Sequence, residues 1–168
     1  MMLIITDIPS ANLTPSDSEY VFIENDREIT PCRGCFKCWI KTPGQCPIDD
    51  GFGNTGKLLS ECGSLIIVSK LTYGSFSPFV KNVLDRAISY VHPYFRIINN
   101  EMHHRLRYGN KLSCSAYFYT DNNGDLPDEA EKNTACRLVN ANCKNFGATV
   151  NNIIFLDSCE RLQGLSLS

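Results

Sequence analysis

Short apolar segments recur along the chain and predict five strands. They are rich in β-branched and aromatic residues: LIIT (3–6), YVFI (20–23), LIIVS (65–69), LSCSAYFY (112–119) and NIIFL (152–156). Their apolar residues are nearly continuous rather than alternating with polar ones. This pattern is typical of strands that are buried on both faces of a parallel sheet.

Three segments between these runs have the spacing of amphipathic helices. They are the stretch that follows Asp50 and stops at Gly63, residues 77–90, and residues 128–146. We expect Ser77 to cap the second helix and Gly147 to end the third. Strands that alternate with helices predict a single α/β domain over residues 1–168, with an open parallel sheet and helices on both faces.

The connection between the first two strands is too short for the usual crossover. About a dozen residues, DIPSANLTPSDS (7–18), lie there and include two prolines, whereas a parallel crossover normally contains a helix. The first crossover helix is therefore expected to be shortened or absent. Either the chain crosses in an irregular loop, or the strand near Tyr20 pairs differently. Ligands of such sheets bind beyond the carboxyl ends of the strands, in the loops after residues 7, 25, 69 and 119.

Composition excludes several kinds of partner. The chain has 168 residues, with 16 basic and 18 acidic side chains and a net charge of -2, so it lacks the cationic field that nucleic acid or an anionic membrane would require. The first residues have no basic leader, and no segment approaches the length of a membrane span. We therefore expect a cytoplasmic protein with neither nucleic acid nor membrane as partner.

Nine cysteines, an odd number, favour free thiols or metal ligands over a framework of disulfides. Four of them form a C-x2-C-x2-C-x7-C motif: Cys32, Cys35, Cys38 and Cys46. This spacing can supply four thiolates to a [4Fe–4S] cluster, but it is also compatible with unmetallated thiols or with a closed zinc site. Of the others, Cys62, Cys114 and Cys143 lie at apolar-periodic positions and are expected in the core.

The motifs resemble a known family. The cysteine loop ending in Asp49-Asp50, the strand followed by LTYGSFSPFVKNVLDR (71–86), and EMHHRLRY (101–108) resemble the flavodoxin-like NADPH-dependent FMN reductases, including iron–sulfur flavoproteins. The resemblance implies a five-stranded parallel sheet in the order 2-1-3-4-5, with FMN at the carboxyl ends of the strands. It also implies a homodimer or homotetramer that completes the flavin pocket, and a Lys-x-x-x-Asp-Arg helix behind the flavin ring.

The resemblance also names candidate cofactor residues. A flavin ring needs close backbone approach, an aromatic wall and a few aimed hydrogen-bonding groups. The loop after the third strand offers Thr72, Tyr73, Gly74, Ser75, Phe76 and Ser77. The loop after the fourth strand adds Thr120, Asn122 and Gly124. With the first helix absent, the FMN phosphate would depend on the backbone around Ser10, Asn12 and Thr14.

These observations favour an FMN-dependent NAD(P)H oxidoreductase that passes electrons to a small-molecule or protein acceptor. No side chain is assigned as a catalytic acid or base, because the cofactor itself carries hydride chemistry. Two alternatives remain. One is an electron carrier of the iron–sulfur flavoprotein type with a [4Fe–4S] cluster on the cysteine loop. The other is a flavin-free interaction subunit with a flavodoxin-like fold. EMHHRLRY and the residues before it are expected to pack at a subunit interface or over the pocket.

Overall fold

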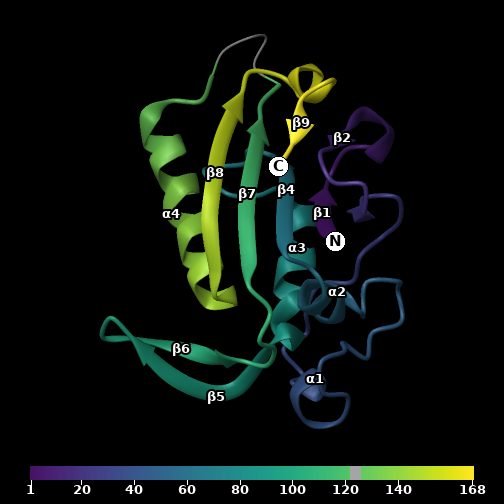
Figure 1. Ribbon diagram of the computed structural model, residues 1–168, viewed down its shortest axis with the longest axis vertical. Helices are drawn as coiled ribbons and strands as arrows, with labels where there is room; N and C mark the ends of the chain where they lie inside the picture. The colour runs from purple at the N-terminus through teal and green to yellow at the C-terminus, as the bar shows by residue number, and fades with distance from the viewer. Residues whose placement is uncertain (122–125) are drawn as a thin grey trace.

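The computed structural model describes residues 1–121 and 126–168. Five parallel strands form an open sheet in the order β3-β1-β4-β7-β8 (Figure 1). Their bounds are β1 Met2–Thr6, β3 Tyr20–Glu24, β4 Ser64–Lys70, β7 Leu112–Tyr119 and β8 Ala148–Leu156. The five predicted strands and the order 2-1-3-4-5 are confirmed.

The central strands are buried on both faces, as their continuous apolar sequences predict. All five residues of β1 are buried, and successive side chains point to opposite faces. Leu3 and Ile5 belong to the apolar cluster on one face, whereas Met2 and Ile4 belong to the cluster on the other. The sheet is therefore the middle layer of the domain.

Three α-helices of the described chain cover one face of the sheet (Figure 1). They are α2 (Thr55–Glu61), α3 (Pro78–Arg86) and α4 (Glu129–Phe146). All three predicted helical segments are confirmed, although the second ends as an α-helix at Arg86 and continues as the 3-10 turn η2 (Ala87–Tyr90).

The helix ends are only partly those expected. The Asp128 carboxylate accepts a 2.7 Å hydrogen bond from the backbone N–H of Glu131, and Gly147 adopts φ 67°, so both ends of α4 are capped. Ser77 occupies the position before α3, but its hydroxyl makes no capping bond. That expectation was wrong, and Pro78 at the first turn needs no hydrogen-bond acceptor for its nitrogen.

Within residues 1–121 and 126–168, the other face is covered by short turns and strands rather than by α-helices. These are η1 (Ser10–Asn12), β2 (Thr14–Pro15), η3 (Cys159–Leu162) and β9 (Ser166–Leu167). β2 pairs in parallel with β9, and Leu13, Leu162 and Leu167 contribute to the apolar cluster on this face. The helices expected on this second face are thus replaced by 3-10 turns.

The β1–β3 connection explains this difference. β3 pairs in parallel with β1, so the chain crosses in an irregular loop, and the absence of a crossover α-helix in this described segment is confirmed. Pro9 and Pro15 remove backbone donors from the short connection, which prevents a continuous α-helix there.

A two-stranded hairpin extends from the end of the sheet where the strands begin (Figure 1). It consists of β5 (Val91–Ile98) and β6 (Glu101–Leu106), joined through Asn99 and Asn100 with φ of 50° and 64°. The short helix α1 (Lys37–Ile40) lies at the same end of the molecule. Within the described ranges, no helix is long and apolar enough to cross a membrane.

Candidate functional site

The loop after β4 presents one aromatic side chain to solvent. Thr72 and Ser75 exchange two backbone hydrogen bonds of 2.9 Å, which closes a tight turn over Tyr73 and Gly74. Both central residues have positive φ, 52° and 70°. Positive φ strains a tyrosine, yet its side chain is 95% exposed. An exposed ring at the carboxyl end of a strand is suited to stack on a planar ligand.

Gly74 serves to pack this turn against α4. Its N–H donates a 3.0 Å hydrogen bond to the Glu131 carboxylate, and a Cβ at this position would lie 2.8 Å from Thr134 side-chain atoms. The close approach that the sequence suggested is therefore an approach to α4. Whether it also serves a flavin stays a prediction.

The other candidates in this loop divide between surface and core. Thr72 and Ser75 are half-buried, whereas Phe76 is buried and stacks on Phe118 at 5.3 Å between ring centroids. The Ser77 N–H donates a 2.8 Å hydrogen bond to Ser69 Oγ, and Ser77 Oγ is buried without a partner in the described residues. The exposed part of the candidate ring site is thus formed mainly by Tyr73.

The loop after β1 is already bound to a carboxylate of the protein. The backbone N–H of Ser10 donates a 2.7 Å hydrogen bond to Glu24 Oε2, at the end of the neighbouring strand β3. Asn12 and Thr14 are exposed, and Thr14 belongs to β2. A phosphate would therefore meet a negative side chain at the Ser10 N–H.

A second carboxylate adds to the negative charge of this loop. Asp7 accepts hydrogen bonds of 2.9 Å from the Lys70 N–H and 3.1 Å from the Tyr119 hydroxyl. Burial, followed by the nearby Asp7 charge, raises the pKa of Tyr119 and keeps it neutral. The Lys70 ammonium group, on the strand next to this loop, pairs with Asp121. The phosphate half of FMN does not fit this arrangement.

Of the candidates after β7, Thr120 is buried and donates a 3.1 Å hydrogen bond to the Asp157 carbonyl. Asn122 and Gly124 lie outside the described residues. The four loops meet at one end of the sheet, as the sequence predicted for a parallel topology.

The cysteine loop lies at the opposite end, near α1 and η2 (Figure 1). All four motif thiols line one small apolar cavity, which Arg86 and Ile88 complete: Cys32, Cys35, Cys38 and Cys46. Gly34 and Phe36 adopt positive φ of 61° and 55°, which allows the backbone to curl around the cavity. The tertiary structure therefore gathers the four cysteines that the spacing grouped.

The four thiols are close enough to affect one another's ionisation. Burial raises the pKa of Cys38 first, and the charges of Cys46, Cys32 and Cys35 raise it further. In the described chain, no group of three histidine, cysteine, aspartate or glutamate side chains could hold a metal ion. A closed zinc site would require every sulfur to lie about 2.3 Å from one metal atom.

Aromatic packing anchors the cysteine loop to the rest of the domain. The Trp39 indole N–H donates a 3.0 Å hydrogen bond to the Ile88 carbonyl. Phe36 stacks on Trp39 at 5.1 Å, and His104 of the hairpin contacts Trp39 at 5.0 Å and Phe95 at 4.8 Å. A continuous row of rings therefore joins the loop to the β5–β6 hairpin.

The histidine pair does not act as one site. His103 bonds through its two ring nitrogens to Asn145 and Glu101, whereas the ring of His104 packs between Trp39 and Phe95. Adjacent strand residues point to opposite faces of a strand, which separates the two rings.

An ion pair that sequence reasoning missed closes the cysteine cavity. Arg86 is 1% exposed, and its guanidinium donates to Asp50 at 2.7 and 3.0 Å. Burial opposes ionisation of Asp50, but hydrogen bonds from Arg86 and from the N–H groups of Thr30 and Phe52 lower its pKa to about 2. The resemblance places the Asp85-Arg86 sequence on a helix behind a flavin ring. The structure instead places Arg86 beside the cysteines.

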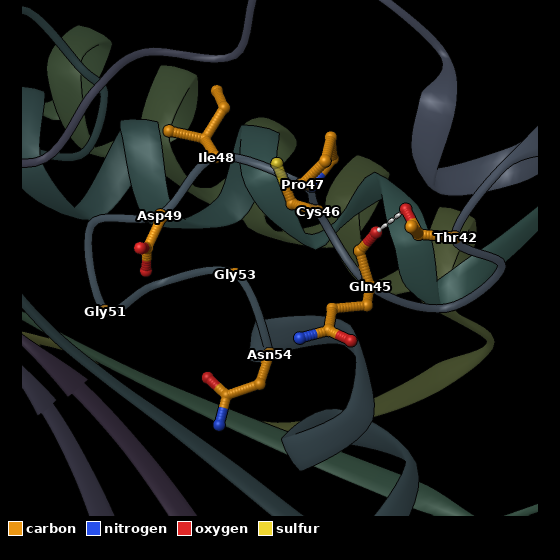
Figure 2. A pocket seen from close by; sticks show the side chains of 9 residues that line it. All are labelled: Thr42, Gln45, Cys46, Pro47, Ile48, Asp49, Gly51, Gly53 and Asn54. Atoms are coloured by element: carbon orange, nitrogen blue, oxygen red, sulfur yellow. Dashed lines mark hydrogen bonds between the residues drawn. The ribbon is translucent and has the colours of Figure 1, made fainter.

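A second, solvent-open cavity of about 510 Å³ adjoins the cysteine loop (Figure 2). Its lining includes Gln45, Asp49 and Asn54, and the Thr42 hydroxyl donates a 2.7 Å hydrogen bond to the Gln45 carbonyl. The segment from Cys46 to Ile48 lines both cavities. It separates the open cavity from the cysteine cavity by a single layer of chain.

The cysteine cavity and the carboxyl ends of the strands are separated by the length of the sheet. β4 runs seven residues between the two ends, roughly 23 Å at about 3.3 Å per residue. Among the described residues of one chain, the candidate cluster site and the candidate flavin site do not touch.

Together these features define a flavodoxin-like fold with a four-cysteine cavity at the amino end of its sheet. No protein-family model matches the chain. An iron–sulfur flavoprotein of Methanocaldococcus jannaschii is 32% identical over 71 residues, which span 42% of this chain and 35% of that protein, about a third of its length. This match confirms the resemblance to iron–sulfur flavoproteins over that stretch.

Solved structures share the fold. An FMN-dependent NADH-azoreductase from Bacillus anthracis, crystallised with FMN, has a TM-score of 0.60 at 15% identity and covers 96% of this chain and 92% of its own. The Trp repressor binding protein from Bacillus subtilis has a TM-score of 0.55 at 9% identity, covering 92% and 85%. At these identities the comparisons establish the architecture, and they agree with the sheet order found here.

Proposed function

We propose that this chain is an electron-transferring oxidoreductase of the iron–sulfur flavoprotein type. The observation that carries the proposal is the convergence of four motif cysteines on one cavity: Cys32, Cys35, Cys38 and Cys46. The partial sequence match to an iron–sulfur flavoprotein supports it independently. The electron donor would be NAD(P)H, as for the azoreductase that shares the fold and is named for its use of NADH.

The donor set that lines the cysteine cavity, four thiols, supports a [4Fe–4S] cluster as the group bound there. A cluster takes one thiolate at each iron, so its four ligands are spread around a cube rather than drawn to one atom. When bound, it would supply one-electron storage. The residues of the chain would hold it by four thiolates, exclude water through the apolar lining, and cover one side with Phe36, which stacks on Trp39.

The two halves of FMN differ in how well the residues present suit them. Tyr73 presents an exposed ring at the carboxyl end of β4, which supports binding of the isoalloxazine part. The Glu24 carboxylate already accepts the Ser10 N–H, and the Asp7 carboxylate adds negative charge to the same loop, which opposes binding of the phosphate part. We infer that the chain binds the flavin ring and gains little from its phosphate. A bound flavin would supply hydride acceptance from the nicotinamide.

A second copy of the chain would complete the electron path. The two candidate sites lie at opposite ends of one sheet, so contact between them requires another copy. The hairpin supports self-association, because it exposes several large apolar side chains by more than half: Tyr94, Phe95, Ile97 and Met102. A homodimer or homotetramer follows as part of the proposal, with a small-molecule or protein electron acceptor.

The test is anaerobic reconstitution of the full chain with iron and sulfide, followed by iron, sulfide and flavin analysis. We expect about four irons per chain and the broad visible absorbance of a cluster. Cys38→Ser should lose iron, whereas Cys136→Ser, which alters a half-buried thiol outside the motif, should retain it. Equal iron in both variants, or none in the unmodified chain, would contradict the cluster.

A flavin-free interaction subunit is the second candidate, and the Glu24 contact favours it. A chain that loads neither FMN nor riboflavin after reconstitution would support that alternative. Flavin loading without iron would instead support a simple FMN-dependent NAD(P)H reductase.

A further inference from the structure

Arg86 has more hydrogen-bonding capacity than its partners in the structure use. Nη1 donates to the Thr30 carbonyl at 2.9 Å and to Asp50 at 2.7 Å, and Nη2 donates to Asp50 at 3.0 Å and to the Ile48 carbonyl at 3.3 Å. Nε is buried and has no partner within the described part of the chain. An unpaired donor on a buried cation is costly, so its retention points to an acceptor within the cavity that Arg86 lines.

The position of this guanidinium identifies the kind of ligand. Arg86 lines the cavity that the four cysteines line, and it interacts with the Cys46 thiol. Arg33 also lines the cavity, but it is exposed, so water screens its charge. Arg86 is therefore the buried cation at the cysteine cavity.

We propose that Arg86 is a positioning residue that donates a hydrogen bond to the Cys46 sulfur or to the adjoining sulfur of the cluster and stabilises its reduced form. This role rests on the proposed cluster. Four thiolates give the cluster a net negative charge, which grows by one electron on reduction. A fixed N–H donor and a buried positive charge beside a sulfur therefore favour the reduced form and raise the reduction potential.

Asp50 has the complementary task. The two Asp50 oxygens bind the two Nη groups and fix the plane of the Arg86 guanidinium. A lysine in place of Arg86 could not be oriented in this way, because its charge is a single point. The negative charge of Asp50 also offsets part of the Arg86 charge. The two members of the pair should consequently shift the potential in opposite directions.

The experiment compares reduction midpoints of the reconstituted full chain. Asp50→Asn keeps Arg86 and removes the offsetting charge, so its midpoint should be more positive than that of the unmodified chain. The double variant Asp50→Asn/Arg86→Met removes both charges and the donor, and its midpoint should be more negative. It also avoids leaving a buried unpaired carboxylate. A tenfold change in the reduced-to-oxidised ratio corresponds to 59 mV for one electron, and at least that separation is expected between the two variants.

The surface pair Lys81–Asp85 on the same helix gives matched controls. Asp85→Asn and Asp85→Asn/Lys81→Met should leave the midpoint unchanged, because both side chains are solvated. Circular dichroism and iron content establish that each variant is folded and loaded. Loss of the cluster from the folded double variant alone would overturn this role, since Arg86 would then retain the cluster rather than set its potential.

The two proposals fail in different ways. No iron or sulfide in the unmodified chain would overturn the cluster and the role of Arg86 together. A fully loaded chain whose midpoint is the same in Asp50→Asn and in the double variant would overturn the role of Arg86 alone.

Discussion

The backbone N–H of Ser10 and the carboxylate of Glu24 are joined by a 2.7 Å hydrogen bond across the ends of two neighbouring strands. This bond places a negative charge where the loop after β1 would otherwise offer a donor to an anion. The Glu24 carboxylate thus occupies the donor that an anion such as the FMN phosphate would use in this loop.

Glu24→Gln should improve binding of FMN relative to riboflavin. The unmodified chain should bind the two with similar affinity, and the variant should favour FMN by about tenfold, the equivalent of one weak charge-assisted hydrogen bond. Fluorescence titration with both flavins measures the ratio. Glu28→Gln, an exposed carboxylate in the following loop, is the control. An unchanged ratio in Glu24→Gln would show that the phosphate does not reach this loop.

Tyr73→Gly should separate flavin binding from folding. Glycine adopts positive φ without strain, so the free energy of unfolding should stay the same or rise by up to about 1 kcal/mol. Loss of the exposed ring should weaken flavin binding by about threefold to tenfold, which is the size of one aromatic stacking contact. Urea denaturation and flavin titration of the same preparation test both parts. Unchanged affinity would remove Tyr73 from the site.

The Asp50–Arg86 pair should make stability depend on pH in the acid range. The folded-state pKa of Asp50 is about 2, below its usual 3.8, so the stabilisation is complete above about pH 4 and is lost as the pH falls toward 2. A shift of this size corresponds to on the order of 2 kcal/mol. Denaturation of the unmodified chain and of Asp50→Asn between pH 5 and pH 2 should converge as the acid limit is approached. A constant difference would contradict the assignment.

Gly56→Ala should destabilise the packing of α2 on η2. A Cβ at this position would lie 2.1 Å from Ser89 Oγ and 2.9 Å from the Tyr90 nitrogen. We expect a loss of about 1–3 kcal/mol, the usual cost of overpacking. Gly63→Ala is the control, since no atom lies within 4 Å of its Cβ position. Equal unfolding midpoints for the two variants would show that α2 can move away from η2.

Ile97→Glu together with Met102→Glu should shift the chain toward the monomer. Both side chains are at least 70% exposed on paired strands of the hairpin, and burying two charges in an apolar interface is unfavourable. Sedimentation equilibrium across a range of concentrations measures the change. An oligomer of unchanged affinity would place the interface elsewhere.

Local sequence predicted most of the scaffold because local forces decide it. The apolar run of β4 is stable only when both of its faces are buried. Asp128 caps the start of α4 with its side chain, and Gly147 ends the helix because its backbone adopts positive φ. The same logic predicted that the short segment after Thr6 could not hold a crossover helix.

The sites were only partly predictable. The spacing of Cys32, Cys35 and Cys38 grouped three thiols on one loop, and the cavity that includes Cys46 agrees with that grouping. Phe76 had the correct residue type for an aromatic wall, but a ring at that position gains more free energy by stacking on Phe118 in the core. Sequence periodicity alone could not decide between these two surroundings.

The amino-acid sequence by itself determined the five strands, the helices between them and the cysteine grouping, because each depends on residues close together in the chain. Only the tertiary structure decided that Arg86 meets Asp50 and the cysteines, 36 or more residues away, and that Glu24 binds Ser10. Those contacts form where separate segments cross at the ends of the sheet. Their partners are selected by burial and by charge, and no spacing within the sequence records them.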